Sequence, residues 1–174
     1  MADLVTHACV LLLPAAFLPH TRYLPLLVGG ALLPDVMGRG PSIVSRMLWD
    51  AGVVLPERWV SGLSILHEPL PLVLMVAFLS LSFIPRQRLW AALAMGVGVA
   101  SHLALDLMQD HHGVGYHVWA PFGRDRFELG WFASDATVLL APWLALSCAV
   151  CWFLRWRVSA RRRNSTHSVD RSSG

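Results

Sequence analysis

The sequence contains no lysine and few charged residues of any kind. Its 14 basic residues are all arginine, and charged residues make up 14% of the 174 positions, against roughly 25% in an ordinary soluble domain. So few polar side chains do not cover the surface of a soluble globule of this size. Hydrophobic residues make up 55% of the chain, and the mean hydropathy is +0.53. The composition therefore excludes a disordered chain and predicts an integral membrane protein.

The net charge of +3 does not indicate a nucleic-acid partner. Many of the arginines flank the last apolar run, at Arg155, Arg157, Arg161, Arg162 and Arg163. A nucleic-acid-binding protein needs basic residues on a folded face, whereas arginines beside an apolar span are typical of the cytoplasmic end of a membrane helix. We therefore expect no nucleic-acid partner.

Cysteine is scarce and gives no sign of a zinc cluster. Cys148 and Cys151 form a C-x-x-C pair inside an apolar run, and Cys9 stands alone. No second pair completes a cysteine zinc site, so we interpret these residues as small buried hydrophobes. The N-terminus has no basic region and carries Asp3 and His7 early, which does not fit a cleaved signal peptide.

Five apolar runs predict an all-α fold, a polytopic membrane helical bundle of about five apolar helices. The runs cover residues 4–18, 24–33, 70–84, 89–108 and 131–154. A helix that rises ~1.5 Å per residue needs about 20 residues to cross about 30 Å of hydrocarbon. The first two runs are short for this and suit a hairpin of short or re-entrant helices. Residues 36–66 are expected to form short interfacial helices, one of them opening at Pro41, and residues 109–130 an ordered loop.

The arginines also predict an orientation and a domain boundary. Arg22, Arg86, Arg88 and the C-terminal cluster gather on one side of the predicted bundle, and this side is assigned to the cytoplasm. Residues 1–156 are expected to form one membrane-embedded domain. Residues 157–174 are expected to form a basic, then Ser/Thr-rich, disordered cytoplasmic tail. We thus expect a multi-pass protein of the bacterial inner membrane, surrounded by lipid bilayer, with a cytoplasmic C-terminus.

Histidines and acidic residues concentrate at the ends of the apolar runs opposite these arginines. They are His7, Asp35, His67, Glu68, His102, Asp106, Asp110, His111 and His112. Placing an ionisable residue at the centre of a membrane helix costs about 2.5–3.5 kcal/mol. A bound cation offsets this cost, because it neutralises the carboxylate and uses the lone pair of the histidine. His102 and Asp106 stand at i and i+4 and share one helix face. The pattern predicts a metal site at the non-cytoplasmic boundary of the membrane.

Several of these residues also have simpler interpretations. A single histidine such as His102 in an apolar run is usually packed and hydrogen-bonded, and an aspartate after proline, such as Asp35, is often a turn or capping residue. His117 and Asp125 are most simply loop contacts. Pro69 is expected to begin a helix, which places His67 and Glu68 at its N-terminal end.

Five motifs in order give the chain a family resemblance. They are Thr6-His7-Ala8, Leu32-Leu33-Pro34-Asp35, Leu66-His67-Glu68, Ser101-His102-Leu103-Ala104-Leu105-Asp106, and Gly113-Val114 through Trp119-Ala120-Pro121-Phe122. The sequence resembles the YdjM-type family of LexA-binding, inner-membrane-associated metal-dependent hydrolases, over most of the chain up to about Trp131. The resemblance implies that the metal ligands are His7, Asp35, His67, His102 and Asp106.

The sequence departs from the family pattern at three places. Val36-Met37-Gly38 stands where the family often has a second Asp and a His, and Gly62-Leu63-Ser64 stands where it has His-Arg-Gly. Glu68 replaces a serine. These departures remove part of the family's polar shell, and Glu68, Asp110, His111 and His112 are candidates to compensate.

The leading hypothesis is an integral membrane metal-dependent hydrolase that acts on a phospholipid, an isoprenoid phosphate or another amphiphilic phosphate or ester. Three imidazoles and two carboxylates suit zinc, with manganese or iron as alternatives. Glu68 is the candidate general base, and one of Asp110, His111 or His112 is expected to assist the leaving group. The alternatives are a non-enzymatic protein that binds metal or conducts ions or protons, and a structural protein whose histidines only pack.

Overall fold

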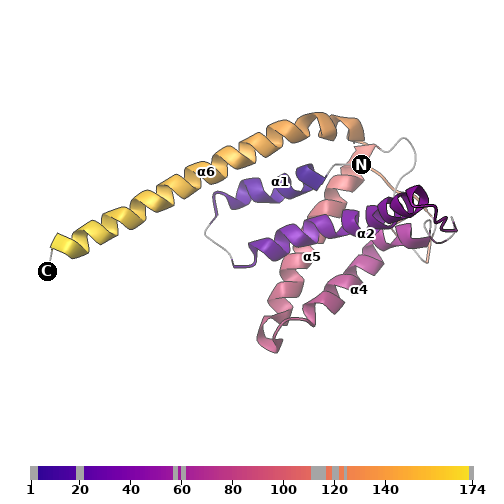
Figure 1. The fold of residues 1–174 in the computed structure, drawn as a ribbon, viewed down its shortest axis with the longest axis horizontal. Helices are drawn as coiled ribbons and strands as arrows, with labels where there is room; N and C mark the ends of the chain where they lie inside the picture. The colour runs from indigo at the N-terminus through magenta and orange to yellow at the C-terminus, as the bar shows by residue number, and fades with distance from the viewer. Residues whose placement is uncertain are drawn as a thin grey trace.

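The computed structural model describes residues 4–18, 22–56, 59, 62–110, 117–118, 122–123 and 125–172, with residues 64 and 161–172 given as backbone. Its elements, in chain order, are α1 (Leu4–Ala15), α2 (Leu24–Asp50), the 3₁₀ turn η1 (Ser64–His67), α4 (Pro69–Ser80), α5 (Pro85–Met108), β1 (Gln109–Asp110), β2 (Phe132–Ala133) and α6 (Ser134–Ser172). The two short strands pair in parallel, with Gln109 opposite Phe132. The predicted all-α fold is confirmed (Figure 1).

Two of the helices in the described part of the chain are long and apolar enough to cross a membrane. They are α5 and the first part of α6, Ser134–Ala160. The other two apolar helices, α1 and α4, have 12 residues each. At ~1.5 Å per residue such helices are ~18 Å long, well short of the hydrocarbon thickness. A multi-pass topology therefore remains a prediction.

Helix α2 corrects one expectation. The second apolar run was expected to end at Asp35, with a separate interfacial helix from Pro41, but α2 is continuous and contains Pro34 and Pro41. Proline inside a helix removes a hydrogen bond and normally breaks or kinks it. Here α2 crosses α5 in close contact (Figure 1), and Asp35 pairs with Arg39 one turn later. These contacts stabilise the continuous helix, so Asp35 lies in its interior.

Small residues let α2 and α5 approach closely. A Cβ atom at Gly30 would overlap the backbone of Met95, and one at Gly98 would overlap the backbone of Leu27 and Ala31. Next to this crossing, α4 packs against α5 through the apolar core of the described residues, Leu72, Val76, Ala91, Met95 and Val99. The crossing brings the interior of α2 against the last turns of α5.

Helix α6 lies along α1 and extends beyond the other helices at its C-terminal end (Figure 1). Arg155 Nη1 donates to the carbonyl oxygens of Ala15 (2.6 Å) and Ala16 (3.1 Å), and Trp152 Nε1 donates to Leu12 O (3.0 Å). These bonds join α6 to carbonyl groups at the C-terminal end of α1, where a helix leaves acceptors exposed to additional donors. The backbone of α6 continues to Ser172, where the sequence predicts a disordered tail, and the boundary at residue 156 stays a prediction.

The cysteines of α1 and α6 meet at the same interface. Cys9 and Cys148 are buried, all three cysteines are free, and the Cys148 thiol lies 3.6 Å from Cys9 O. For Cys9 and Cys148, the interpretation as small buried hydrophobes is confirmed.

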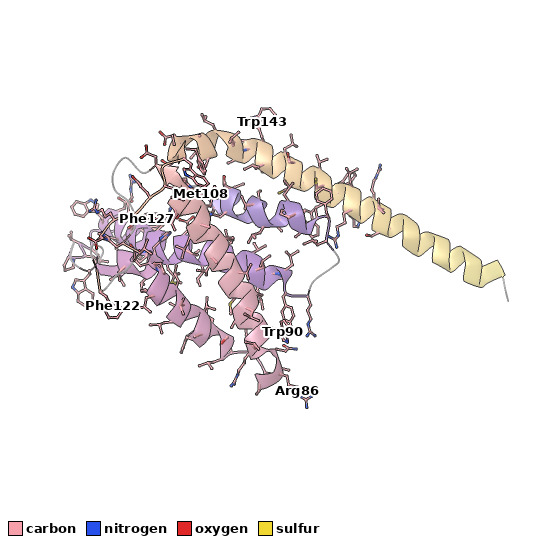
Figure 2. All side chains as sticks on the ribbon, turned by 180° about the vertical axis from the view of Figure 1, so that it is seen from behind. Arg86, Trp90, Met108, Phe122, Phe127 and Trp143 are labelled. Carbon is pink, nitrogen blue, oxygen red and sulfur yellow. The ribbon has the colours of Figure 1, made fainter. Side chains whose placement is uncertain are left out.

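The outer surface carries many large apolar side chains. Leu139, Phe78 and Trp143 are 75%, 68% and 68% exposed, and Trp143 points outward from α6 in Figure 2. Exposed apolar surface of this extent is typical of a face that contacts lipid. Arg86 lies at the end of α5 opposite Met108 (Figure 2), so the arginine turn and the last turn of α5 are at opposite ends of the bundle.

Candidate metal centre

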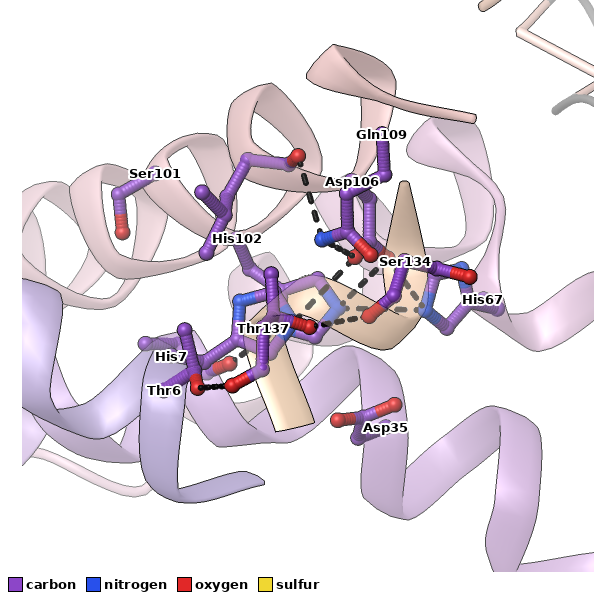
Figure 3. A network of polar contacts seen from close by, with 12 residues as sticks. Thr6, His7, Asp35, His67, Ser101, His102, Asp106, Gln109, Ser134 and Thr137 are labelled. Carbon is purple, nitrogen blue, oxygen red and sulfur yellow. Dashed lines mark hydrogen bonds and ion pairs between the residues drawn. The ribbon is translucent and has the colours of Figure 1, made fainter. Parts of the chain in front are cut away.

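The five predicted metal ligands meet in one buried cluster. α1 contributes His7, α2 contributes Asp35, η1 contributes His67, and the last two turns of α5 contribute His102 and Asp106 (Figure 3). All five are buried, with 0–5% of each residue exposed. Such burial is rare for charged or titratable side chains unless they are paired or bind a metal.

The spacing of three ligand atoms matches a tetrahedral metal site. His102 Nε2 lies 3.2 Å from Asp106 Oδ2 and 3.2 Å from His67 Nε2, and the third edge, His67 Nε2 to Asp106 Oδ2, is 3.5 Å. Ligands ~2.1 Å from a tetrahedral zinc ion lie ~3.4 Å from one another. The three atoms therefore stand where three ligands of one ion would stand.

A backbone carbonyl fixes the orientation of His102. Its Nδ1 lies 2.6 Å from Ala31 O, and because a carbonyl only accepts, Nδ1 carries the proton and donates. In the neutral ring Nε2 then has the lone pair and points at the cluster. A hydrogen bond from the second ring nitrogen is the usual support of a metal-binding histidine.

The same tautomer places two buried acceptors face to face. The Nε2 lone pair of His102 faces a carboxylate oxygen of Asp106 at 3.2 Å, so two acceptors oppose each other unless a proton or a cation lies between them. Since the surroundings are buried, this repulsion is not screened by water. A divalent cation satisfies both atoms at once.

His7 and Asp35 form a second ligand group that shares His102. The His7 ring stacks on the His102 ring with centroids 3.6 Å apart, and its Nε2 lies 3.3 Å from Asp106 Oδ1. One ligand atom each from His7, Asp35 and His102 lies within 4.8 Å of the others. Asp35 Oδ1 accepts from Arg39 Nε at 3.0 Å, whereas the buried Oδ2 has no hydrogen-bond partner. Both rings and both carboxylates thus offer atoms that suit a cation.

Several supporting residues were not predicted from the sequence. Gln109 Nε2 lies 3.4 Å from Asp106 Oδ1 and donates to it, and a Cβ atom at Gly38 would lie 3.0 Å from Cβ and Cδ2 of His67. Gln109 follows Asp106 by three residues, and this short spacing at the end of the predicted helix was a usable signal, because residues three apart on a helix are neighbours. The contact of Gly38 with His67 has no signal in the local sequence.

Burial keeps His67 neutral. It lies outside the two candidate spans, and its burial lowers the pKa of the imidazole from 6.5 to about 4, although the Asp106 carboxylate opposes this. The ring is therefore uncharged near pH 7, and a lone pair remains available to a metal.

Glu68, the predicted general base, lies beside the cluster and outside both ligand groups. It is buried, its Oε1 accepts from the backbone N–H of His117 at 3.4 Å, and Oε2 has no hydrogen-bond partner. Burial raises the pKa of its carboxyl group. The structure also confirms that Pro69 begins α4 directly after it.

The other predicted catalytic residues have less definite positions. Asp110 is half-buried in β1, directly after α5, where it pairs with Ala133. His111 and His112 lie outside the described residues. Their proposed role in catalysis stays a prediction.

An apolar pocket of about 250 Å³ lies between α1, the end of α5, β2 and the start of α6. Thr6 and Leu105 line it, and they are the chain neighbours of His7 and Asp106. Thr6 Oγ1 donates to Thr137 O at 3.4 Å, so the two threonines form a wall of the pocket next to the cluster (Figure 3).

Comparison with known proteins agrees with the motifs. No curated protein and no solved structure matches the chain. The family model described as YdjM inner membrane protein matches residues 3–169, which is nearly the whole chain. The resemblance carried by the ordered histidine and aspartate motifs is thus confirmed. The chain belongs to the YdjM inner membrane protein family.

Proposed function

We propose that the protein is a membrane-embedded metal-dependent hydrolase. His67, His102 and Asp106 would hold a divalent ion, and His7 and Asp35 would complete its ligands or hold a neighbouring ion. The observation that carries this proposal is the triangle of 3.2, 3.2 and 3.5 Å between the Nε2 atoms of His67 and His102 and Asp106 Oδ2. Zinc suits imidazole and carboxylate ligands best, with manganese or iron as alternatives.

The ion would supply Lewis acidity toward a phosphoryl or acyl oxygen and would activate water near neutral pH. The protein's own residues orient the ligands: the Ala31 carbonyl holds the His102 ring, and Gln109 holds the Asp106 carboxylate. Glu68 is the proposed general base, because its Oε2 has no hydrogen-bond partner and its raised pKa suits proton acceptance. Asp110, His111 or His112 would donate the proton to the leaving group.

The surroundings support an amphiphilic substrate. The apolar pocket of about 250 Å³ lies beside the cluster, and it offers a place for part of a hydrocarbon chain. The cluster is at the end of α5 that is opposite Arg86 (Figure 2). With the arginines in the cytoplasm, we propose a multi-pass protein of the bacterial inner membrane, with a cytoplasmic C-terminus and the site at the non-cytoplasmic boundary. A phospholipid or another amphiphilic phosphate or ester would reach it from the bilayer.

Ion or proton conduction fits the described residues less well. The buried residues of α5 on the arginine side of His102 are small or apolar: Ala91, Met95, Gly98 and Val99. A conduction path needs polar groups or water along the helix. A polar cluster confined to one end of α5 is instead typical of a site that binds a ligand and catalyses its reaction.

Metal analysis of protein purified in detergent tests the proposal. We expect roughly stoichiometric zinc, manganese or iron in the wild type and loss of the metal in the double variant His102→Ala, Asp106→Ala. Asp50→Ala is the matched control, because Asp50 is an exposed carboxylate at the end of α2. Metal that stays bound in the double variant, or a wild type without metal, would contradict the proposal.

Hydrolysis is tested on the same samples. We expect the metal-loaded wild type to cleave a short-chain phospholipid in mixed micelles, and the double variant to be inactive. The conducting alternative would be favoured by a different result. The protein would then bind metal and carry ions into proteoliposomes, but it would hydrolyse none of a panel of amphiphilic phosphates and esters.

A further inference from the structure

We propose that the apolar pocket between α1 and α6 binds one hydrocarbon chain of the substrate, and that its size favours chains of about ten carbons. The inference rests on the proposed function, because it needs the reacting group of the substrate at the metal centre, and it adds a chain length to that function. The observation behind it is a pocket of about 250 Å³ with an apolar wall that begins beside two of the proposed ligands.

Two threonines form part of this wall without making it polar. Thr137 Oγ1 donates to Ser134 O at 2.6 Å, and Thr6 Oγ1 donates to Thr137 O at 3.4 Å (Figure 3). Both hydroxyl groups are thus directed to backbone carbonyls, and the wall of the pocket is apolar. A phosphate, sugar or peptide group would lose its water here without a hydrogen bond in return, whereas a hydrocarbon chain has no such cost.

The pocket begins at the ligand cluster and continues along α6. Thr6 and Leu105 line it and are the chain neighbours of His7 and Asp106. The first part of α6, Ser134–Ala160, is a candidate membrane span. With the cluster at the membrane boundary, the pocket therefore extends from this boundary into the hydrocarbon layer, which is the direction in which the chain of a lipid lies.

The outer side of the pocket is accessible from the bilayer. Val10 and Leu140 line it and are 39% and 55% exposed. An empty apolar pocket leaves the atoms of its wall without contact partners on one side, and an apolar wall does not hold ordered water. A hydrocarbon chain entering from the bilayer supplies these contacts, and its head group would then lie at the proposed metal.

Two measures of size give the same chain length. A dry cavity of about 150 Å³ holds one benzene, which has six carbons, so about 250 Å³ holds about ten carbons. The wall reaches from Ala136 to Leu144 on α6, which is ~12 Å at ~1.5 Å per residue. An extended chain advances ~1.2 Å per bond, so ten carbons cover ~11 Å of this length.

Alkylphosphonates test the inference without turnover, because their carbon–phosphorus bond is not a phosphate ester and their phosphonate group can still bind a metal. Methyl-, decyl- and tetradecylphosphonate would be titrated by calorimetry into metal-loaded protein in one detergent. Each variant is compared with the wild type for the same probe, so the partition of the probe into micelles cancels from the ratio.

Ala136→Phe fills the pocket with a large side chain. We expect it to bind decylphosphonate about 10- to 100-fold more weakly than the wild type and to bind methylphosphonate equally well. Ala149→Phe is the matched control, because Ala149 is an exposed alanine of α6 outside the wall of the pocket, and it should bind every probe as the wild type does.

Leu144→Ala enlarges the end of the pocket that is far from the ligands. It should raise the affinity for tetradecylphosphonate, relative to decylphosphonate, by about 4-fold or more, which is the effect of one additional buried methylene. This variant tests the inference even if Ala136→Phe does not fold, since an unchanged ratio of the two affinities would overturn it.

Metal content measured on each sample separates the outcomes. Equal decylphosphonate binding by the wild type and Ala136→Phe, with metal in both, would overturn this inference alone. Equal weakening of the methyl and decyl probes would show a general effect on the site and would count against a chain pocket. Metal-loaded wild type that binds none of the probes would also overturn the inference. A wild type without metal would overturn the proposed function and this inference together.

Discussion

The crossing of α2 and α5 offers the sharpest test of how the fold positions the candidate metal centre. In Gly98→Ala, the added methyl group would overlap the Leu27 carbonyl and the backbone of Ala31. These atoms are backbone, so no side chain can rotate away, and the two helices must move apart. At this crossing α2 contributes Ala31, and the backbone carbonyl of Ala31 orients the His102 ring. Gly98 lies one turn before His102 on α5, so the strain falls next to a proposed ligand.

The size of the effect follows from the contact distances. Relief of the overlap at Gly98 needs a separation on the order of 1 Å. A shift of this size stretches the 2.6 Å contact between His102 Nδ1 and Ala31 O beyond hydrogen-bond range. Metal ligands tolerate only about 0.2 Å of misplacement, and loss of a hydrogen bond to a ligand typically costs about 10- to 100-fold in metal affinity. We expect a loss in that range, and a free energy of unfolding lowered by about 1–3 kcal/mol.

Gly96→Ala provides the matched control on the same helix, because a Cβ atom there meets nothing within 4 Å. Alanine favours the helix by up to about 1 kcal/mol over glycine, so this variant should be as stable as the wild type or more so and should retain its metal. Both variants would be assayed by metal content after dialysis against a graded chelator series and by thermal unfolding in detergent. If Gly98→Ala retains metal as tightly as Gly96→Ala, the crossing does not position His102 and the reasoning is refuted.

Three further predictions concern His67 and the end of α1. Gly38→Ala would place a methyl group 3.0 Å from the His67 ring and should weaken metal binding about 10-fold. Gly40→Ala is the control, because its methyl group meets open space and should leave metal binding unchanged. Equal metal retention by the two variants in a chelator series would show that the contact of residue 38 with His67 does not position the ring. In the chelated protein the pKa of His67 is lowered by burial from 6.5 to about 4, so the unfolded state binds more protons and stability should fall as pH drops from 6.5 toward 4. Thermal unfolding measured across this pH range should show that stability declines less steeply with falling pH in His67→Gln than in the wild type. An equally steep decline in both proteins would exclude His67 as the cause of the pH dependence. Arg155→Met removes both arginine hydrogen bonds to the end of α1 and should lower the free energy of unfolding by about 1–3 kcal/mol. Arg157→Met is the control, because it changes an exposed arginine and should leave the free energy of unfolding unchanged. Thermal unfolding followed by circular dichroism compares the two variants.

The membrane class and the membership of the site were predictable because both depend on local or compositional signals. The i, i+4 spacing of His102 and Asp106 fixes their common face whatever the rest of the chain does. The positions of His7 and His67 at the ends of apolar runs predicted their meeting, because helices that fold back on one another bring their ends together. The structure places both rings within reach of Asp106, at 3.3 and 3.5 Å.

The path of α2 was not predictable by the same reasoning. Pro34 and Pro41 locally favour a break, and only the packing of α2 on α5, which is made between residues far apart in the chain, stabilises the continuous helix. Asp35 was therefore predicted to lie in the cluster, where the structure places it, but for a wrong local reason. It was expected at the end of a hairpin, and it lies inside a helix, where Arg39 one turn later pairs with one of its oxygens.

The origin of the proposed ligands in four separate elements would couple a bound metal to the fold. Helix α1 has 12 residues and is too short to cross the hydrocarbon, so its position depends on contacts with protein. Those contacts include the hydrogen bonds from α6 at its C-terminal end and the His7 ring against His102 near its N-terminal end. If a cation fills the cluster, His7 anchors α1 through it, and the opposed lone pair of His102 and carboxylate of Asp106 become attractive contacts to a common ion. The free energy of metal binding is then also free energy of folding, because without a cation or a proton between them these buried acceptors face each other.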